Sequence, residues 1–497
     1  MRGASGSMDP IEQLMQAMPS LALWLPAVAL SVATAVYLWL AISSRRMPAL
    51  QVWHTAHLDA DFRARDAIAG ADLAHYIGHE RKVFAQLEAV VASAAQAALP
   101  LGRYLQGGRN DPVTFPVNWN RSFELRPPVV RGSALLLHGL TDSPYSLRRT
   151  GEILRDRGFY VLGLRLPGHG TVPAALDNIT RQDWRAAVRI GATHARAQVG
   201  ADDPFWIVGY SNGGTLALDH ALAAIADPAL GRPSRLVLIS PAVGVSPFAA
   251  MGRWHQPLSL LPFFEKFRWH TIYPEHDPFK YNSFPKSAAF QTHRLIAELR
   301  REFDRLVGAG RATELPPILA FQSAADATVR TSAVLDSLFL SLAGTESELV
   351  VFDINRVSYM QEYFADDPTQ RLAELCEPPG PPFRLTLVTN ADSDTQQVVA
   401  RTWSPGSGLP VDEPLGLSWP LGVFSLSHVS VPFPPDDPVY GDGGAGIPEW
   451  GVPLGSVEPR GERELLSVPI ELFTRLRYNP FFSYLERRLV EAADRDS

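Results

Sequence analysis

The chain has 497 residues, of which 46% are hydrophobic and 20% charged, an ordinary composition for a globular protein with a large core. The net charge of −7, with no basic stripe among aromatic residues, argues against a general nucleic-acid-binding protein. The single cysteine, Cys376, excludes an internal disulfide framework and a multi-cysteine metal site.

An uncharged stretch lies close to the N-terminus, after a short tail whose first seven residues (1–7) look like an added tag and are left out of fold reasoning. Residues 20–42 read SLALWLPAVALSVATAVYLWLAI, 23 residues that as a helix would be roughly 34 Å long, enough to cross a bilayer. Trp24 and Trp39 lie towards its two ends, where aromatic rings suit the interface. We predict a transmembrane helix.

Two alternatives to a membrane anchor are a cleaved signal peptide and a buried core helix. A signal peptide is disfavoured because residues 4–19 contain no Lys or Arg and the apolar run is longer than usual. Arg45 and Arg46 follow the span directly, so the positive-inside rule predicts a single-pass protein with its globular part in the cytoplasm. The alternative is a periplasmic or other extracytoplasmic location.

Residues 54–99 show apolar spacings of three to six, which predicts a helical region. His75 and His79 are four residues apart and share a helical face, as metal ligands often do. Their sequence is HYIGHE rather than H-E-x-x-H, and no third ligand is evident. We therefore predict no metal site.

From Pro112 onward the sequence consists of short apolar runs separated by stretches with helical patterns. Continuous apolar runs of this length are typical of strands buried on both faces of a parallel sheet, and their alternation with helices predicts an α/β doubly wound fold. The six predicted strands are 133–137, 160–164, 205–208, 236–239, 318–321 and 349–352.

Two insertions interrupt this alternation. Residues 246–310 are rich in aromatic residues and are predicted to form a cap or lid, with its aromatics either lining an acyl pocket or forming a small core. Residues 356–427 contain FRLTLVTN and QQVVARTW, which predict a β-hairpin.

The segment Gly209-Tyr210-Ser211-Asn212-Gly213 directly follows a predicted strand and precedes a predicted helix. This is the G-x-S-x-G pattern of a nucleophile elbow, in which a sharp turn lifts the serine hydroxyl towards substrate. The turn also places the Asn212 amide at a helix N-terminus, where it can donate to an oxyanion. A structural turn without catalysis is the alternative.

A second oxyanion donor is expected from the loop after the strand that ends in His138-Gly139. We predict the backbone N–H of Leu140 for this role. His138 itself is predicted to hold the loop in shape rather than to act in the chemistry.

A serine nucleophile needs a general base and a carboxylate that orients the base. The chain has 13 histidines, and His428 alone lies after residue 293. For the acid we predict Asp326, which follows the strand 318–321, with Asp353 as the rival after the next strand. His428 lies 102 residues after Asp326, an unusually long spacing that requires the second insertion to return the chain to the site.

These motifs together resemble the α/β-hydrolase superfamily, and more narrowly its monoacylglycerol lipase, carboxylesterase and serine aminopeptidase branch. The resemblance covers roughly residues 110–355 and the stretch around His428. The sequences that carry it are HGLTD (138–142), LPGHG (166–170), Asp183-Trp184, GYSNGG (209–214) and Asp326.

The predicted function is a serine esterase or lipase that acts on apolar or acylglycerol-like esters, without a metal or organic cofactor. Peptidase, thioesterase and acyltransferase activities remain open because they use the same triad, and a catalytically dead, membrane-tethered binding protein is the non-enzymatic alternative. The sequence does not predict an oligomeric state. The predicted regions are the tail 1–19, the transmembrane helix 20–42, a helical region 43–109, the hydrolase core 110–245 and 311–355, the cap 246–310, the insertion 356–427 and the C-terminal part 428–497.

Overall fold

The computed structural model describes residues 10–68, 70–94, 101–244, 264–443, 452, 454–456 and 474–496. The described residues fall into two compact units. The first holds those up to residue 49 together with 264–269, and the second holds the remainder. Residues 246–263, the first part of the predicted cap, lie outside the described residues.

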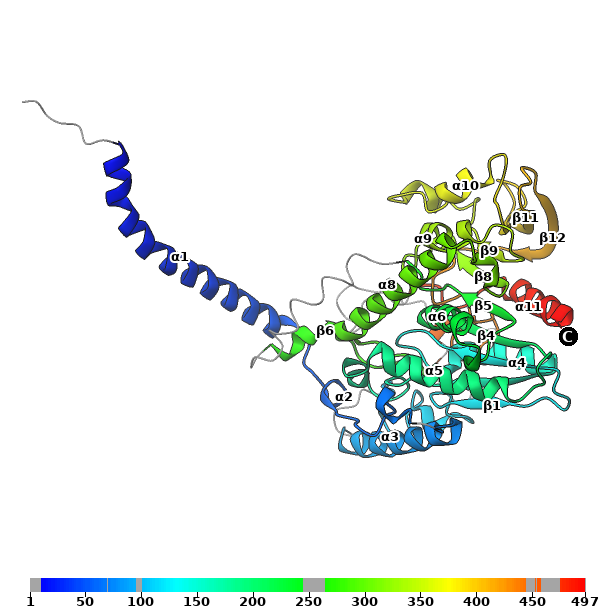
Figure 1. Ribbon diagram of the computed structural model, residues 1–497, viewed down its shortest axis with the longest axis horizontal. Helices are drawn as coiled ribbons and strands as arrows, with labels where there is room; N and C mark the ends of the chain where they lie inside the picture. The colour runs from blue at the N-terminus through cyan, green and yellow to red at the C-terminus, as the bar shows by residue number, and fades with distance from the viewer. Residues whose placement is uncertain are drawn as a thin grey trace, which may run out of the picture. The chain divides into compact units, whose positions relative to one another are not determined.

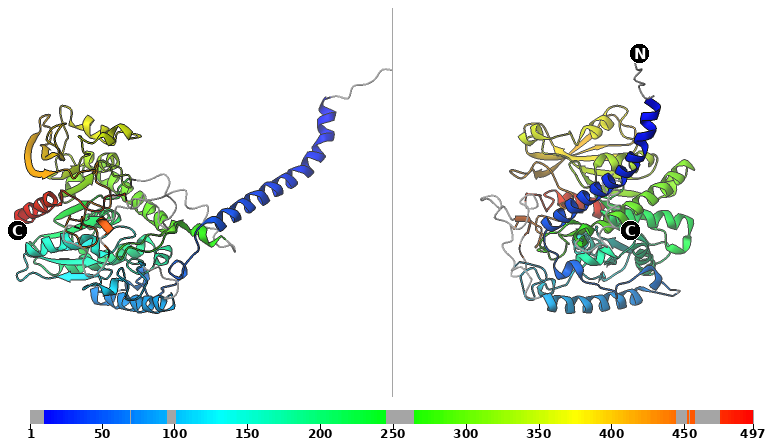
Figure 2. Two further views of the ribbon diagram at one scale, coloured as in Figure 1. Left: turned by 180° about the vertical axis from the view of Figure 1, so that it is seen from behind. Right: turned by 90° about the vertical axis from the view of Figure 1, so that its left-hand side faces the viewer.

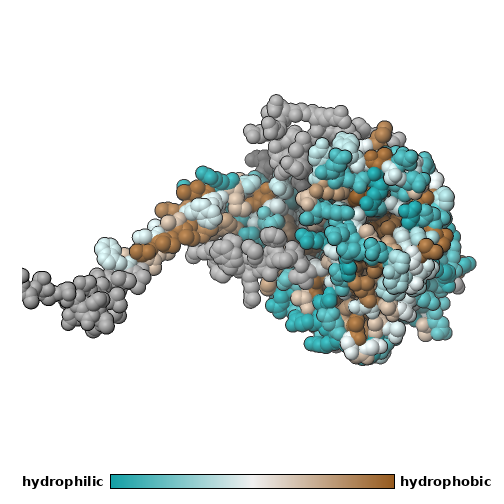
Figure 3. All heavy atoms as spheres, turned by 90° about the horizontal axis from the view of Figure 1, so that it is seen from above, coloured by the Kyte–Doolittle hydropathy of each residue, from teal (hydrophilic) through white to brown (hydrophobic). Residues whose placement is uncertain are grey.

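The first unit contains helix α1 (Pro10–Arg46), which includes the whole predicted span 20–42. Its portion Pro26–Arg46 is long and apolar enough to cross a membrane. Trp24 and Leu30 are each 70% exposed, and apolar residues cover much of this helix (Figure 3). Such exposure does not fit a core helix, since a core helix buries its apolar side chains.

The second unit is organised around one sheet (Figure 1), with ten strands among the described residues in the order β1-β3-β2-β4-β5-β8-β9-β10-β11-β12. The pairs from β3 to β10 are parallel, whereas β1 and the last two strands pair antiparallel. The strands are β1 (Phe123–Leu125), β2 (Gly132–Leu137), β3 (Phe159–Leu164), β4 (Phe205–Tyr210), β5 (Arg235–Ile239), β8 (Ile318–Ser323), β9 (Glu348–Phe352), β10 (Arg384–Asn390), β11 (Gln397–Trp403) and β12 (Val411–Ser418).

The six strands predicted from apolar runs are confirmed as β2, β3, β4, β5, β8 and β9, and every residue in them is buried. Successive side chains of a strand point to opposite faces, so each strand contributes to two cores. In β5, Leu236 and Leu238 pack on one face, while Val237 and Ile239 pack on the other.

Helices cover both faces of the sheet (Figure 2). Side chains of α5 (Arg181–Arg196), α6 (Asn212–Ala226), α8 (Lys286–Gly308) and α9 (Thr331–Ser337) belong to one core. Side chains of α4 (Arg148–Asp156) and α11 (Phe482–Asp496) belong to the other. The remaining elements are α2 (Val52–Thr55), α3 (Leu73–Ala94), α10 (Gln370–Cys376), β6 (Trp269–Thr271) and β7 (Phe284–Pro285).

The prediction of a helical region over 54–99 is wrong for its first third. After α2, the described residues 56–68 and 70–72 contain only the short 3-10 turn Ala64–Asp66 before α3 begins. The physical reason is a polar contact: Asp61 is buried against Arg165 in the loop after β3, so its backbone follows the core rather than a helix.

A buried ionic cluster ties this N-terminal region to the core. The Arg165 guanidinium pairs with Asp61 (2.6 Å) and Glu80 (3.3 Å), and all three side chains are at most 4% exposed. Arg165 also donates to the His169 carbonyl (3.0 Å), and the Gly168 N–H donates to Asp61 (2.7 Å). The cluster therefore shapes the LPGHG loop.

The chain after β9 extends the main sheet instead of leaving it. Strand β10 pairs in parallel with β9, β11 pairs antiparallel with β10, and β12 pairs antiparallel with β11. The segments that predicted a hairpin are therefore two strands of a larger sheet. Because the periodicity of a strand does not reveal its partner, the sequence could not show this.

Replacing Arg165 with Met should lower the free energy of unfolding by about 3–5 kcal/mol, because it leaves two buried carboxylates without a partner. Urea unfolding followed by circular dichroism measures the change. Arg305→Met is the matched control: its ion pair with Glu302 is 69% and 58% exposed, so its loss should cost no more than about 0.5 kcal/mol. Equal losses in the two variants would contradict a structural role for the buried cluster.

Candidate active site

Ser211 lies at a sharp turn between β4 and α6. Its backbone is left-handed, with φ +53° and ψ −116°, a conformation that L side chains rarely adopt. A Cβ atom on Gly213 would lie far inside contact distance of the Leu137 carbonyl oxygen, and one on Gly209 would collide with the Gly213 backbone. The two glycines therefore allow the tight backbone approach that this turn requires.

The structure brings Ser211, Asp326 and His428 into one hydrogen-bonded chain. The distance from Ser211 Oγ to His428 Nε2 is 3.1 Å, and that from His428 Nδ1 to Asp326 Oδ2 is 2.7 Å. Because a carboxylate only accepts, Nδ1 carries the hydrogen and Nε2 is left to accept from the serine. His428 is 5% exposed and Asp326 is 4% exposed, so both lie largely out of water.

Asp326 is held rigidly in the loop after β8. Its Oδ1 accepts the N–H groups of Thr328 and Val329, both at 2.8 Å, and its Oδ2 accepts the Gln322 side-chain amide at 3.2 Å. These bonds orient the carboxylate towards His428. The rival acid, Asp353, is engaged elsewhere, since it pairs with Arg356 (2.9 Å) and accepts a bond from Thr389 (2.7 Å).

His428 returns to the site on a segment that crosses the carboxyl ends of several strands. The Ser323 hydroxyl at the end of β8 donates to the Leu426 carbonyl (2.8 Å), and the Asn355 N–H after β9 donates to the Phe424 carbonyl (2.8 Å). The Tyr210 hydroxyl at the end of β4 donates to the His428 carbonyl (3.4 Å). The long excursion through β10–β12 thus ends at the edge of the sheet where it began.

The two predicted oxyanion donors lie on neighbouring segments. Asn212 is the first residue of α6, and the close approach of Gly213 to Leu137 and His138 brings this helix start against the loop that carries Leu140. His138 holds that loop: its Nε2 accepts the Leu166 N–H (3.0 Å), and its Nδ1 bonds to the Gly139 carbonyl (2.9 Å). Burial lowers the pKa of His138 well below its ordinary value, which keeps the ring neutral.

The described aromatic residues of the predicted cap fall into both units: Phe264, Phe267 and Trp269 belong to the first, whereas Phe279 and Tyr281 are buried in the second. Phe279 stacks on Tyr145 with ring centroids 4.1 Å apart, and both belong to a buried cluster with Phe433 and Tyr440. Tyr281 is 3% exposed, and its hydroxyl accepts the Thr171 N–H (2.7 Å). Phe279 and Tyr281 are therefore buried against residues outside the predicted cap, whereas Phe248, Trp254 and Phe263 lie outside the described residues.

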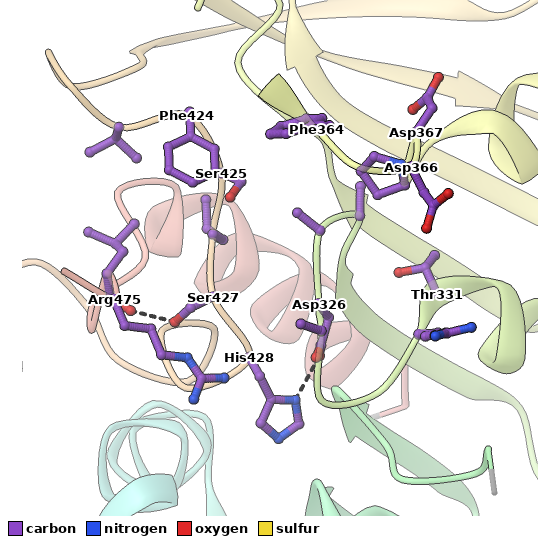
Figure 4. A pocket seen from close by; sticks show the side chains of 18 of the residues that line it. Asp326, Thr331, Phe364, Asp366, Asp367, Phe424, Ser425, Ser427, His428 and Arg475 are labelled. Carbon is purple, nitrogen blue, oxygen red and sulfur yellow. Dashed lines mark hydrogen bonds and ion pairs between the residues drawn. The ribbon is translucent and has the colours of Figure 1, made fainter. Parts of the chain in front are cut away.

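A cavity of about 1350 Å³ borders the two partners of Ser211, and Figure 4 shows Asp326 and His428 at its wall. Much of its wall comes from residues 363–374 and 420–427 of the insertion 356–427, and the rest comes from the loop around Asp326, Gly455 and residues 474–478. Phe364 and Phe424 line it with rings 6.0 Å apart. No sequence pattern predicts this cavity, because its walls meet only after β10–β12 have joined the sheet.

Metal-ligating side chains are dispersed in the described part of the chain, where no group of three His, Cys, Asp or Glu residues could hold an ion. The rings of His75 and His79 do meet, at 5.0 Å between centroids. His79 Nδ1 forms a hydrogen bond with the Ala60 carbonyl oxygen (3.1 Å), which is a structural contact.

Known proteins resemble the segment that carries the elbow. Residues 128–354 match the family model described as "Serine aminopeptidase, S33". A thermostable monoacylglycerol lipase from Bacillus sp. (strain H-257) is 29% identical over 218 residues, which cover 44% of this chain and 78% of that lipase. Both matches support the resemblance of residues 128–354 to the α/β-hydrolase superfamily. The resemblance of the hydrolase core to the monoacylglycerol lipase and serine aminopeptidase branch is thereby confirmed, and the core is of the lipase/esterase type.

Solved structures of lipolytic enzymes are also similar. The chain described as "LipS and LipT, two metagenome-derived lipolytic enzymes" is 20% identical, with a TM-score of 0.37 over 52% of this chain and 98% of its own. The monoacylglycerol lipase of Paleococcus ferrophilus is 19% identical, with a TM-score of 0.35 over 47% and 88%. Since the family match ends at residue 354, His428 of the hydrolase lies outside it.

Replacing Gly213 with Ala should lower kcat/KM for an ester at least about a hundredfold, because the added methyl group forces the Ser211 turn away from the end of β2. Steady-state kinetics and the rate of serine labelling measure the effect. Gly78→Ala is the matched control: it lies within α3 with no atom inside 4 Å of the added Cβ, so activity should not change. Full activity in Gly213→Ala would contradict the tight elbow.

Proposed function

We propose that this protein is a serine hydrolase that cleaves carboxylic esters through an acyl-enzyme, with Ser211 as nucleophile, His428 as general base and acid, and Asp326 as the residue that orients His428. The observation that carries the proposal is the hydrogen-bonded chain of these side chains, at 3.1 Å and 2.7 Å. The lipase/esterase type of the core supports it. No metal or organic cofactor is needed for this chemistry.

In the first half-reaction, Ser211 Oγ attacks the ester carbonyl carbon while its proton passes to His428 Nε2. The carbonyl oxygen becomes an oxyanion, which accepts hydrogen bonds from the backbone N–H groups of Leu140 and Asn212. Asp326 stabilises the imidazolium that forms and keeps the hydrogen on Nδ1. The intermediate collapses as His428 gives its proton to the departing alcohol, leaving the acyl group on Ser211.

In the second half-reaction, water takes the place of the alcohol. His428 Nε2 removes a proton from the water, and the oxygen attacks the acyl carbon. The same two amides hold the second oxyanion. Collapse breaks the bond to Ser211 Oγ, which recovers its proton from His428, and the carboxylic acid leaves.

For the substrate we infer an apolar or acylglycerol-like ester. The similar Bacillus protein is named a monoacylglycerol lipase, and the cavity beside His428 has room for a large group, being above the roughly 300–1,000 Å³ of common ligand pockets. Because His428 hands its proton to the departing alcohol, a group in this cavity belongs to the alcohol side of the ester.

Replacing Ser211 with Ala, or His428 with Ala, should lower kcat for a short-chain p-nitrophenyl ester by about a thousandfold or more, because each removes a group that acts in both half-reactions. A fluorophosphonate probe should label the natural protein at Ser211 and leave Ser211→Ala unlabelled. Mass spectrometry of the labelled peptide identifies the site.

The two buried aspartates offer a matched pair for the same assay. Asp326→Asn should lose at least about a hundredfold in kcat, because an amide cannot stabilise the imidazolium. Asp353→Asn should retain activity, since Asp353 binds Arg356 and Thr389 instead of the histidine. Unchanged turnover in Asp326→Asn or in Ser211→Ala contradicts the proposed triad.

We propose further that residues 20–42 anchor the enzyme in a membrane as a single-pass helix with the hydrolase core in the cytoplasm. The support is the apolar helix over Pro26–Arg46 and the two arginines at its end. An anchor of this kind would keep the enzyme near lipid-derived esters. No oligomeric state and no nucleic-acid partner form part of the proposal.

The full chain should stay in the membrane fraction after extraction with alkaline carbonate, and its core should resist protease added outside intact cells. Leu30→Arg should weaken this membrane association, because a cation at the centre of a transmembrane helix raises the free energy of membrane insertion by about 2.5–3.5 kcal/mol. Val129→Arg, which changes an exposed residue of the core, serves as the control. A mature chain that begins after residue 30 would instead reveal a cleaved signal peptide.

A further inference from the structure

A buried carboxylate lies beside the peptide that carries the proposed oxyanion donor Leu140. Asp142 is 7% exposed, and a Cβ atom placed on Gly139 would lie 2.6 Å from its Oδ2. Gly139 directly precedes Leu140, so the carboxylate folds back over the Gly139–Leu140 peptide. The mechanism described above does not use this group.

Asp142 is paired with one cation from the cap. Lys280 Nζ lies 2.8 Å from Asp142 Oδ1, and the lysine side chain is 24% exposed. Burial raises the pKa of Asp142 above its ordinary value, and the charge of Lys280 opposes that shift. Asp142 and Lys280 thus form a short, hydrogen-bonded ion pair beside the Gly139–Leu140 peptide.

The loop that carries Lys280 is attached to the loop that carries Asp142. The Tyr281 N–H donates to the Thr141 carbonyl (2.8 Å), and Thr141 is held in a left-handed conformation with φ +70°. The ion pair and this backbone bond flank the turn from both sides. Together they fix the direction of the peptide that begins with Gly139.

Lys280 is in turn held by Asp277, a buried residue three positions earlier. The Lys280 N–H donates to Asp277 Oδ1 (3.1 Å), and the Tyr440 hydroxyl donates to the same oxygen (2.6 Å). Arg477 pairs with Asp277 Oδ2 (3.1 Å). The position of the lysine is therefore set by residues from the C-terminal part of the chain.

A carboxylate beside an oxyanion hole opposes catalysis, since two negative charges repel strongly where water is scarce. A paired cation cancels most of that repulsion. We propose that Lys280 is a positioning and charge-compensating residue: it holds Asp142 and the Leu140 turn in place and neutralises the carboxylate as negative charge develops on the substrate oxygen. This inference rests on the proposed esterase function.

The test is a double-mutant cycle in the full-length protein with Lys280→Met, Asp142→Asn and the double variant. With a neutral p-nitrophenyl ester, Lys280→Met should lower kcat at least about tenfold while KM stays within about twofold, because the lost effect acts only on the charged transition state. Asp142→Asn should lose no more than about threefold. The double variant should recover most of the loss seen in Lys280→Met.

A second readout separates charge compensation from a merely structural role. A trifluoromethyl ketone forms a hemiketal oxyanion with the nucleophilic serine, so Lys280→Met should raise its inhibition constant by about the same factor by which kcat falls. Lys280→Arg should restore tight inhibition, and Lys82→Met, on the exposed face of α3, is the control for loss of a lysine.

The inference is overturned if Lys280→Met keeps its kcat, or if the double variant is no more active than Lys280→Met. Should Lys280→Met fail to fold, Asp142→Asn alone decides: a tenfold rise in its inhibition constant for the ketone contradicts the proposal. Failure of the esterase function looks different, because the natural protein would then neither hydrolyse the ester nor label at Ser211, and this inference would fall with it.

Discussion

The hydrogen bond between His428 and Asp326 is the constraint on which the C-terminal third of the hydrolase depends. The histidine comes 102 residues after the aspartate, and the four strands β9 to β12 lie between them. These strands continue the sheet away from the site, so the chain must travel back across the sheet edge before His428 can meet its partner. Bonds from Ser323, Asn355 and Tyr210 hold that returning segment to the ends of β8, β9 and β4. The same return path encloses the large cavity beside the histidine.

A second theme is that buried charges hold the loops at the carboxyl ends of the strands. In parallel α/β sheets these ends are where ligands bind, so the loops there must be ordered without filling the site. Arg165 holds the loop after β3 through Asp61 and Glu80, and Lys280 pairs with Asp142 after β2. Buried ion pairs contribute little net stability compared with apolar packing, but removing one partner is costly. Their value in this fold is that they specify one loop geometry.

Sequence patterns succeeded where local chemistry decides the structure. The six central strands were predicted because each is a continuous apolar run, and such runs are buried on both faces. The turn at Ser211 was predictable because its G-x-S-x-G pattern is local; its glycines are required by contacts within the turn and with Leu137 at the end of β2. Patterns failed where distant residues decide: the described residues 56–68 and 70–72 are not α-helical, since Asp61 is drawn to Arg165, and β10–β12 join the sheet through partners that periodicity does not reveal.

The sequence by itself therefore determined the fold class, the α/β-hydrolase resemblance and the turn at Ser211, and it predicted His428 as the partner, since no other histidine follows residue 293. Only the tertiary structure decided how His428 reaches Ser211, that Asp353 is engaged by other side chains, and that Lys280 pairs with Asp142. The physical reason is the range of the interactions. Strands and tight turns follow largely from neighbours in the chain, whereas hydrogen bonds and ion pairs between different strands and loops form only once the sheet has assembled.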